Sequence, residues 1–377
     1  MTARPASDEH VEALLSARIE AGDFPSAVYA VARGGQLRFA GALGDAVRAP
    51  ERRAATLETI YDLASLTKPL VTGLLCALMV ERKLLSLDDG VARHLPEFGR
   101  DDKRALTVRH LVTHTSGLPA WRPLYALAEG RERALEVVAA QPLEYEPGAR
   151  VVYSDLGFIT LGLLLCRLAS AELPALARRE IFEPLGLRRT FFNPDRAFVT
   201  ETAACESEGN AYEREMCRAG HGVADAVSFR DSQIWGEVHD GNAHFLGGAA
   251  GHAGLFSTAR ETHLIAEQFL PSRTRLLSAD TCALFRTNMT DGLNEARSLA
   301  WQLAATPAST AGPLLAPDSF GHLGFTGTSC WVDPVRDAVF ILLTNRTHAR
   351  GAQPFVNINS VRREFHALAV EALERGG

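Results

Sequence analysis

The stretch YDLASLTKPLVTGLLCALM, residues 61–79, joins a polar head to a long apolar run. Ser65 and Lys68 stand three residues apart in it, and Pro69 follows at once. Because proline is tolerated only in the first turn of a helix, the spacing predicts a helix that begins close to Ser65. Residues three apart share one helix face, so we expect the Ser65 hydroxyl and the Lys68 amine to lie side by side.

Lysine is rare in this chain, where only Lys68, Lys83 and Lys103 occur among 39 lysine and arginine residues. Lys83 and Lys103 lie in charged runs and are expected to be solvated, whereas Lys68 stands among apolar residues. A buried lysine can lose its proton and act as a base, which an arginine cannot do. A helix N-terminus also favours the developing negative charge of a reacting serine. The alternative is an N-cap serine followed by a lysine that snorkels to the surface.

Composition places the chain among soluble globular proteins. Its 377 residues are 46% hydrophobic and 22% charged, and the net charge is −6. This length predicts two lobes or domains, and the absence of a basic excess argues against a nucleic-acid partner. The longest apolar stretches, 69–80 and 156–166, are about half of the ~20 residues that a bilayer crossing needs. We expect buried helices there and no membrane span.

Two pairs of apolar runs predict β-hairpins, one near each end of the chain. They are 27–32 with 37–43, and 329–332 with 338–344. Gly34 and Gly35 join the first pair, and glycine supplies the positive φ angles of a tight turn.

Helical spacing predicts a helix near each terminus, one with Ser7 as its N-cap and one over 360–375. The middle of the chain shows mainly helical stretches broken by Pro- and Gly-rich loops. We therefore expect an α+β fold, in which an antiparallel sheet from both chain ends is flanked by the terminal helices and carries a mainly helical inserted domain. The expected sheet domain is 1–66 plus 256–377, and the expected helical domain is 67–255.

Two further segments carry candidate chemistry. Tyr153 stands just before an apolar helix and is a candidate second proton-transfer group, with Asp155 as a cation partner. Such a tyrosine is otherwise a core or capping residue. In GHLGFTGTS, residues 321–329, the glycines let backbone approach a ligand closely, and His322 adds a polar head.

These motifs follow a known order. Ser65-Leu66-Thr67-Lys68, Tyr153-Ser154-Asp155 and His322-Leu323-Gly324 resemble the SxxK, Tyr-x-Asn and Lys/His-Thr-Gly motifs of serine β-lactamase-like hydrolases. The chain is most similar to class C β-lactamases, low-molecular-weight penicillin-binding proteins and the carboxylesterases related to them. Supporting stretches are 106–118, 247–259 and 320–334. The resemblance covers nearly the whole chain and implies a β-lactamase/transpeptidase-like fold with the active site where the two domains meet.

The resemblance also implies roles for individual residues. Ser65 would be the nucleophile that forms an acyl-enzyme. Lys68 and Tyr153 would share the general acid–base work. The backbone N–H groups of Ser65 and Phe325 would form the oxyanion hole. No cofactor and no metal is expected.

Asp155, His322 and Gly324 would face the substrate, and two of them depart from the family pattern. Asp155 stands where asparagine is commoner; beside Lys68 it favours the charged ammonium and leaves more of the base role to Tyr153. His322 would hold a substrate carboxylate or tune Tyr153. With Leu323 it replaces Lys-Thr, which removes a fixed positive charge. Both departures favour an esterase or a peptidase of altered preference over antibiotic hydrolysis.

Other clusters have competing interpretations. A metal site is conceivable at His239, Asp240, His244 and His252. No recognised ligand spacing accompanies these residues, so we do not expect one. His110 and His114 are four apart, and we expect them to share a helix face as hydrogen-bonded packing residues.

The six cysteines, Cys76, Cys166, Cys205, Cys217, Cys282 and Cys330, show no CxxC pair. We expect free thiols, with a Cys205–Cys217 bridge as the alternative. Residues 1–22 show no apolar core and no cleavage site of a secretory signal, so the expected location is cytoplasmic.

Three functions remain open at this stage. The first is a serine hydrolase that acts on carboxylic esters or small amides. The second is a D-alanyl-D-alanine peptidase or β-lactamase, and the third is a non-catalytic binding relative. The loops 120–150 and 200–245 would shape the substrate pocket, while acid-rich 205–215 is expected to be a solvated surface loop. The expected substrate is a small ester, amide or peptide. The motifs do not predict which one is the natural substrate, and they do not predict the oligomeric state.

Overall fold

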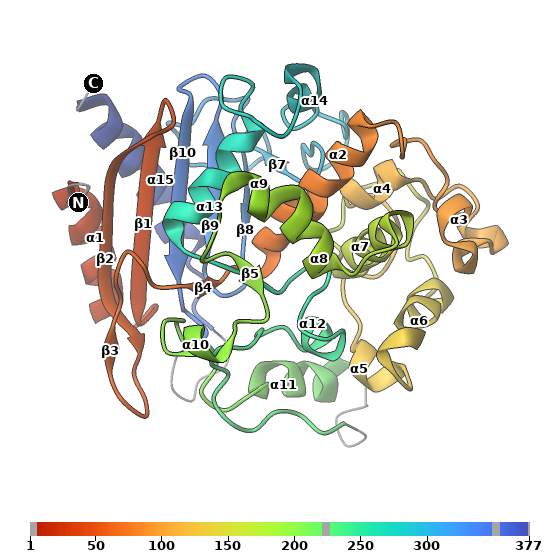
Figure 1. Cartoon of the computed structure of the whole chain (residues 1–377), viewed down its shortest axis with the longest axis horizontal. Coiled ribbons are helices and arrows are strands. Elements are labelled where there is room, and N and C mark those ends of the chain that lie inside the picture. Colours follow the sequence, from red (N-terminus) through yellow and green to blue (C-terminus); the bar gives the residue numbers. More distant parts are fainter. Residues whose placement is uncertain (1–5, 221–226, 349–354, 376–377) are drawn as a thin grey trace.

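The computed structural model of the protein describes residues 6–220, 227–348 and 355–375. Its centre is a seven-stranded sheet in which every neighbouring pair runs antiparallel (Figure 1). In sheet order the strands are β3 (Arg53–Ala54), β2 (Gln36–Val47), β1 (Ser26–Arg33), β10 (Ala338–Thr344), β9 (Ser329–Asp333), β8 (Phe320–Leu323) and β7 (Gln302–Leu303).

The two ends of the chain meet in the middle of this sheet. β1 pairs with β10 through a register that sets Ala30 opposite Ile341. Both predicted hairpins are present, and Gly34 and Gly35 have the positive φ angles, +65° and +73°, that the first turn requires. The predicted α+β fold, with its antiparallel sheet built from both chain ends, is confirmed.

Helices cover both faces of the sheet. On one face α1 (Glu9–Glu20) and α15 (Asn359–Arg375) lie against each other, and α13 (Ala259–Ala266) covers β1 and β10 on the other (Figure 1). The sheet is apolar on both sides: Tyr29 packs with α1 and α15, and Val28 packs on the opposite side. The predicted N-cap Ser7 is wrong by one residue, because the Asp8 carboxylate accepts the N–H groups that open α1.

The middle of the chain is mainly helical, as predicted. Its helices are α2 (Leu74–Glu81), α3 (Val91–His94), α4 (Val108–Val112), α5 (Leu124–Leu127), α6 (Ala134–Ala140), α7 (Asp155–Ala169), α8 (Leu173–Ala177), α9 (Glu183–Leu185), α10 (Arg196–Val199), α11 (Ala211–Gly220) and α12 (Gly241–Phe245), and α14 (Ala279–Ala283) follows later. A small sheet in the order β4 (Tyr61–Asp62), β6 (Leu255–Ser257), β5 (Phe191–Phe192) was not predicted. It ties the segment before Ser65 to the helical part.

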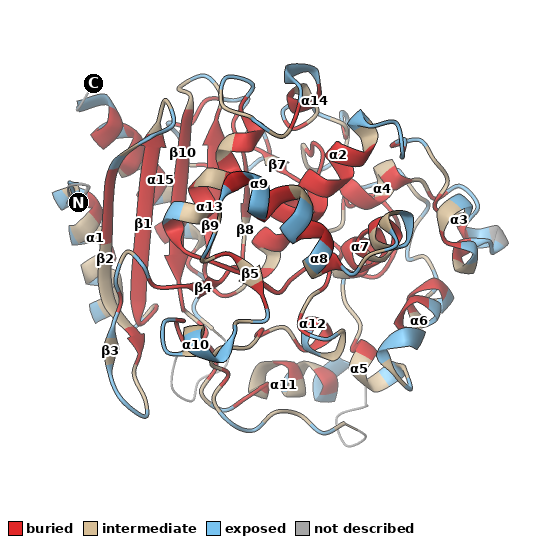
Figure 2. Ribbon diagram, viewed as in Figure 1, coloured by how far each residue is buried: buried red, intermediate tan, exposed pale blue. Residues whose placement is uncertain are grey.

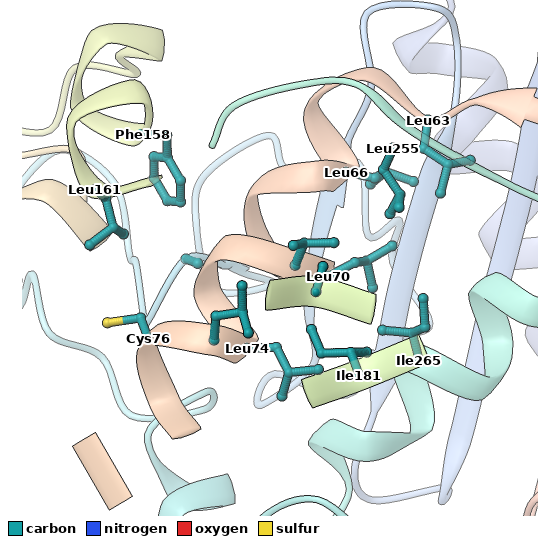
Figure 3. Packing of buried hydrophobic residues seen from close by; sticks show 14 of the residues in the cluster. Leu63, Leu66, Leu70, Leu74, Cys76, Phe158, Leu161, Ile181, Leu255 and Ile265 are labelled. Atoms are coloured by element: carbon teal, nitrogen blue, oxygen red, sulfur yellow. The ribbon is translucent and has the colours of Figure 1, made fainter. Parts of the chain in front are cut away.

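One large apolar cluster fills the space between the sheet and the helices. Leu66, Leu70 and Leu74 on the segment after Ser65 pack near Phe158 of α7 and Ile265 of α13 (Figure 3). Buried residues dominate the central strands and α2 and α7 (Figure 2). The division into domains at residues 67 and 255 stays a prediction.

The two apolar stretches identified in the sequence lie in this core. Ala64–Glu81 is long and apolar enough to cross a membrane, with a mean hydropathy of 1.3 over 18 residues, yet 83% of it is buried inside the molecule. The helices Asp155–Ala169 and Leu173–Leu185 pass the same test only when taken together across a 72° bend.

The six cysteines agree with the expectation from the sequence, whereas Lys103 does not. All six cysteines are unpaired, including Cys205 and Cys217. Lys103 was expected to be solvated, but its side chain is fully buried and its Nζ lies 2.6 Å from the Asp102 carboxylate. A charged run does not reveal which of its members turns inward with a partner.

Candidate active site

Ser65 lies on a short 3₁₀ turn, Ala64–Leu66, that directly follows β4. Asp62, the last residue of β4, accepts a hydrogen bond from the Ala64 N–H at 2.8 Å. Ala64 has a φ of +48°, a conformation that residues with a side chain rarely adopt. The Asp62 carboxylate therefore holds a strained turn that presents Ser65.

The helix after Ser65 begins where the sequence predicts, but in a wider form. A π-helical turn, Lys68–Gly73, precedes α2. A Cβ atom on Gly73 would lie 2.6 Å from the Ala300 methyl, so the chain passes too close here for a side chain. The expected neighbourhood of the two key side chains is present, since Lys68 Nζ lies 3.0 Å from Ser65 Oγ.

The Lys68 ammonium is completely buried and lies beside three oxygen atoms. Besides Ser65 Oγ these are Asp155 Oδ1 at 2.7 Å and the His252 carbonyl at 3.1 Å. Nζ also lies 4.8 Å from the centre of the Tyr153 ring. Asp155 supplies the counter-charge and the other two oxygens accept hydrogen bonds, so the site suits the charged lysine.

Tyr153 is held from both sides by one residue. The Val152 N–H donates to the His114 carbonyl at 2.9 Å, and the Ser154 N–H donates to His114 Nδ1 at 3.0 Å. The His114 ring packs on Tyr153 with centres 4.5 Å apart. The expectation that His114 shares a helix face with His110 is wrong, because α4 ends at Val112 and His114 has a φ of +59°. It is a packing residue, but it packs against the candidate base.

The pKa values of Lys68 and Tyr153 are set by burial and by Asp155. Burial lowers the pKa of Lys68, but Asp155 and Tyr153 together outweigh it, and the pKa lies above the ordinary lysine value. Burial raises the pKa of Tyr153, Lys68 opposes that shift and Asp155 adds to it, so this pKa also lies above its usual range. At neutral pH the pair is an ammonium ion beside a neutral phenol.

The turn between β8 and β9 carries Gly324 and Phe325 to Ser65. Thr326 Oγ1 donates to the Asp62 carbonyl at 2.8 Å, and Thr328 Oγ1 donates to the Leu63 carbonyl at 3.0 Å. A Cβ atom on Gly324 would lie 2.5 Å from the Leu63 carbonyl oxygen, so the close approach requires glycine. Phe325 and Ser65 both line the same pocket, as an oxyanion hole requires.

His322 at the end of β8 is buried and neutral. Burial and the nearby cations Lys68 and Arg297 hold its pKa well below the ordinary histidine value. Its Nδ1 lies 2.8 Å from the Leu323 carbonyl, which only an N–H can satisfy, so Nε2 carries a lone pair. The ring centre lies 5.8 Å from that of Tyr153. Of its two predicted roles, tuning Tyr153 fits this state better than holding a carboxylate.

A pocket of about 400 Å³ opens over these residues. Ser65, Tyr153, Asp155, His322, Gly324 and Phe325 line it, as the sequence predicts, and so do several residues that the sequence analysis did not single out. The latter are Trp121, Tyr212, Glu213, Met216, Gln302, Arg297, Arg346 and Arg362. Trp121 and Tyr212 fall in the two loops expected to shape the pocket; residues 221–226 of the second loop lie outside the described residues.

The expectation for 205–215 is wrong. Cys205, Glu206, Asn210 and Glu213 are buried, and the segment runs into α11. Glu206 accepts from the Tyr212 N–H at 2.9 Å, which helps to hold Tyr212 at the pocket wall. Glu206 and Glu213 turn inward because His239 and the Gly241 N–H pair with them, whereas Glu208 and Glu215 are exposed.

The three candidate histidines lie beside three different carboxylates. His239 Nε2 lies 2.9 Å from Glu206, His252 Nε2 lies 2.9 Å from Asp240, and His244 Nδ1 lies 3.4 Å from Glu237. Within 6–220, 227–348 and 355–375, no group of three or more His, Cys, Asp or Glu side chains is arranged to hold a metal ion. The contribution of His252 to the site is its carbonyl, which the sequence did not indicate.

Fold and site together define a serine hydrolase of the β-lactamase type. The model of the Beta-lactamase family matches residues 11–361, and the chain belongs to that family.

The relatives name several activities. A protein of Escherichia coli strain K12 named "Putative D-alanyl-D-alanine carboxypeptidase" is 32% identical over 327 residues, which cover 81% of this chain and 73% of the relative. Among solved structures, EstCE1, a hydrolase with promiscuous acyltransferase activity, is 23% identical with a TM-score of 0.73 over 95% of this chain and 97% of its own. A class C β-lactamase from Rhodobacter sphaeroides is 20% identical with a TM-score of 0.72 over 97% of this chain and 100% of its own. At these identities the two structures establish the shared fold alone.

Proposed function

We propose that the protein is a serine hydrolase that cleaves carboxylic esters and small amides through an acyl-enzyme on Ser65. One observation carries the proposal: Ser65 Oγ lies 3.0 Å from the buried Lys68 ammonium, at a pocket that Tyr153 and Phe325 also line. A nucleophile, proton-transfer groups and backbone donors thus meet at one opening, as acyl transfer needs.

Each residue of the site has its own role in the reaction. The reactive form has Tyr153 as a phenolate, after its proton is lost to solvent, and the Lys68 charge favours that form. Ser65 Oγ attacks the substrate carbonyl carbon, and its proton passes to the Tyr153 phenolate oxygen. The N–H groups of Ser65 and Phe325 stabilise the oxyanion of the tetrahedral intermediate. Tyr153 returns the proton to the leaving oxygen or nitrogen as the carbon–heteroatom bond breaks. Water then attacks the Ser65 ester by the same route, which releases the acid and restores the serine.

Replacing Asp155 with asparagine is expected to move the pH profile to lower pH. Asp155 raises the pKa of both Lys68 and Tyr153, so its loss lowers both, and the basic form that catalysis needs appears at lower pH whichever group acts as base. The measurement is kcat/KM for p-nitrophenyl butyrate against pH. The exposed Asp280→Asn serves as the matched control. A rising limb that stays in place or moves to higher pH would contradict this assignment of Asp155.

A D-alanyl-D-alanine carboxypeptidase is the second candidate function, and the arginines of the pocket favour it. Arg297 is buried with its guanidinium carbon 6.0 Å from the Tyr153 ring centre, and Arg346 lines the same pocket. Arg297 already pairs with the Glu295 carboxylate at 2.7 Å, so Arg346 is the cation better placed for a substrate that ends in a carboxylate, a role that the neutral His322 does not suit. The name of the Escherichia coli relative agrees with this candidate.

Covalent labelling and turnover together test the proposal. We expect a fluorophosphonate probe to attach to Ser65, located by mass spectrometry of the digested protein, and p-nitrophenyl butyrate to be turned over faster than D-alanine is released from a D-alanyl-D-alanine peptide. Faster release of D-alanine would favour the second candidate. Absence of label at Ser65 with both the fluorophosphonate and a labelled penicillin would overturn both and leave the non-catalytic relative. The cytoplasmic location stays a prediction.

A further inference from the structure

The peptide unit between Gly324 and Phe325 meets different surroundings at its N–H and at its carbonyl. Phe325 lines the pocket, and its N–H has no acceptor among the described residues. The carbonyl of the same peptide, on Gly324, accepts a hydrogen bond from Arg362 Nη2 at 2.8 Å. A cation thus lies at the opposite end of the proposed oxyanion-hole donor.

Arg362 lies on α15 and is only 4% exposed. Its guanidinium meets neutral acceptors only: Gly324 and Thr328 carbonyls at 2.8 and 3.0 Å, and Asn359 Oδ1 at 2.9 Å. Its Nε is buried without a hydrogen-bond partner, and within the described residues no ion pair joins the guanidinium to a carboxylate. Burial and neighbouring Arg346 lower its pKa to about 9, so it remains a cation at neutral pH.

A buried cation without a counter-ion is an expensive way to hold a turn. Removing a charge from water costs several kcal/mol, and a neutral amide donor could bind the same carbonyls. Thr326 and Thr328 already attach the turn to the Asp62 and Leu63 carbonyls. The positive charge itself therefore calls for an explanation.

A second arginine repeats the pattern on the next peptide. Arg346 Nε donates to the Phe325 carbonyl at 2.6 Å, and its guanidinium lies 4.9 Å from the Phe325 ring centre. Two successive carbonyls of the turn are thus bound by cations. Only the carbonyl of Gly324 shares its peptide with the Phe325 N–H, so Arg362 is the one placed to act on that donor.

We propose that Arg362 is a positioning residue that polarises the Gly324–Phe325 peptide and strengthens the Phe325 N–H as an oxyanion donor. A cation on an amide carbonyl draws electron density from the nitrogen, and hydrogen bonds joined through one amide reinforce each other by roughly 10–30% per bond. The gain is larger for the negatively charged tetrahedral intermediate than for the neutral substrate, so it raises kcat more than it lowers KM. The inference rests on the proposed function.

The test compares Arg362→Met, Arg362→Gln and Arg362→Lys with wild type. Methionine removes the donors and the charge, glutamine keeps a donor without the charge, and lysine keeps the charge. We expect kcat for p-nitrophenyl butyrate to fall about fivefold in the first two, with KM within about twofold, and lysine to restore most of the loss. Inhibition by phenylboronic acid, which forms a tetrahedral adduct on a serine, should weaken in parallel.

Arg363→Met is the matched control, because the neighbouring Arg363 on the same helix donates to the Ala308 carbonyl, away from the pocket. Thermal melting of every variant separates folding from catalysis. Wild-type kcat and boronate affinity in either the methionine or the glutamine variant would overturn the proposal, as would a loss confined to melting temperature or KM. Ser65→Ala is measured alongside: if that variant keeps wild-type turnover, the proposed function itself fails, whereas an inactive Ser65→Ala with fully active Arg362 variants removes this inference alone.

Discussion

Replacing Ser65 with alanine is expected to lower kcat/KM for p-nitrophenyl butyrate by about 10⁴-fold or more, because the acyl-enzyme route is lost and only binding and the oxyanion hole remain. Ser65 is half-buried, and its side-chain oxygen accepts one hydrogen bond, from Lys68. Lys68 keeps Asp155 and the His252 carbonyl as partners in the variant. The free energy of unfolding should therefore change by about 1 kcal/mol or less.

Initial rates with matched protein concentrations and a thermal melt of each variant measure both expectations. Ser272→Ala is the control, since Ser272 is an exposed serine whose hydroxyl donates to Asp337 Oδ1. It should behave as wild type, and the fluorophosphonate adduct should persist in it and vanish in Ser65→Ala. Turnover that survives in a folded Ser65→Ala would reject Ser65 as the nucleophile and with it the whole assignment.

The sheet could be predicted because its signals are local. The runs that became β1, β2, β9 and β10 are rich in apolar residues and are joined by short turns, and Gly34 and Gly35 have the conformation that such turns require. The strands β4 and β5 of the small sheet have two residues each, too few for an alternation of apolar and polar residues to show. They exist because β6 binds both, which is a contact between distant parts of the chain.

The candidate site likewise contains residues that local motifs indicate and groups that only the fold brings in. Ser65, Lys68 and Tyr153 stand in motifs of fixed spacing and order, so the sequence indicates them directly. The groups that set their state do not: the His252 carbonyl on Lys68, the His114 ring on Tyr153 and the Asp62 carboxylate under Ala64 come from elsewhere in the chain. Backbone acceptors and left-handed residues leave little trace in composition.

Buried charges were the hardest feature to predict. Lys103 and Glu213 both stand in runs that look solvated, and both are buried. Glu213 accepts from the Gly241 N–H at 2.8 Å, and Lys103 lies beside Asp102. Whether a charged side chain turns inward depends on a partner that the fold supplies, and single-sequence patterns do not contain that information.

Lys68→Arg is expected to lower kcat/KM by about 10³-fold even though the positive charge is kept, within the range found for loss of a general acid–base group. Lys68 Nζ lies beside three oxygen atoms, Ser65 Oγ, Asp155 Oδ1 and the His252 carbonyl oxygen, in a fully buried position. A planar guanidinium directs its donors in a flat fork and adds volume to a packed site, so it cannot satisfy that arrangement. It also cannot give up a proton during the reaction, which a lysine can.

The measurement is kcat/KM over pH for Lys68→Arg beside Lys83→Arg, which changes the exposed lysine and should leave activity and stability unchanged. Because Asp155 retains a cationic partner in the variant, a loss caused only by an unpaired buried carboxylate is avoided. Activity close to wild type in Lys68→Arg would mean that Lys68 serves as a fixed charge and that Tyr153 alone moves the proton. A large loss in a folded variant, with no recovery at higher pH, would show that the lysine amine itself is needed, through its geometry or its proton, because an arginine matches neither.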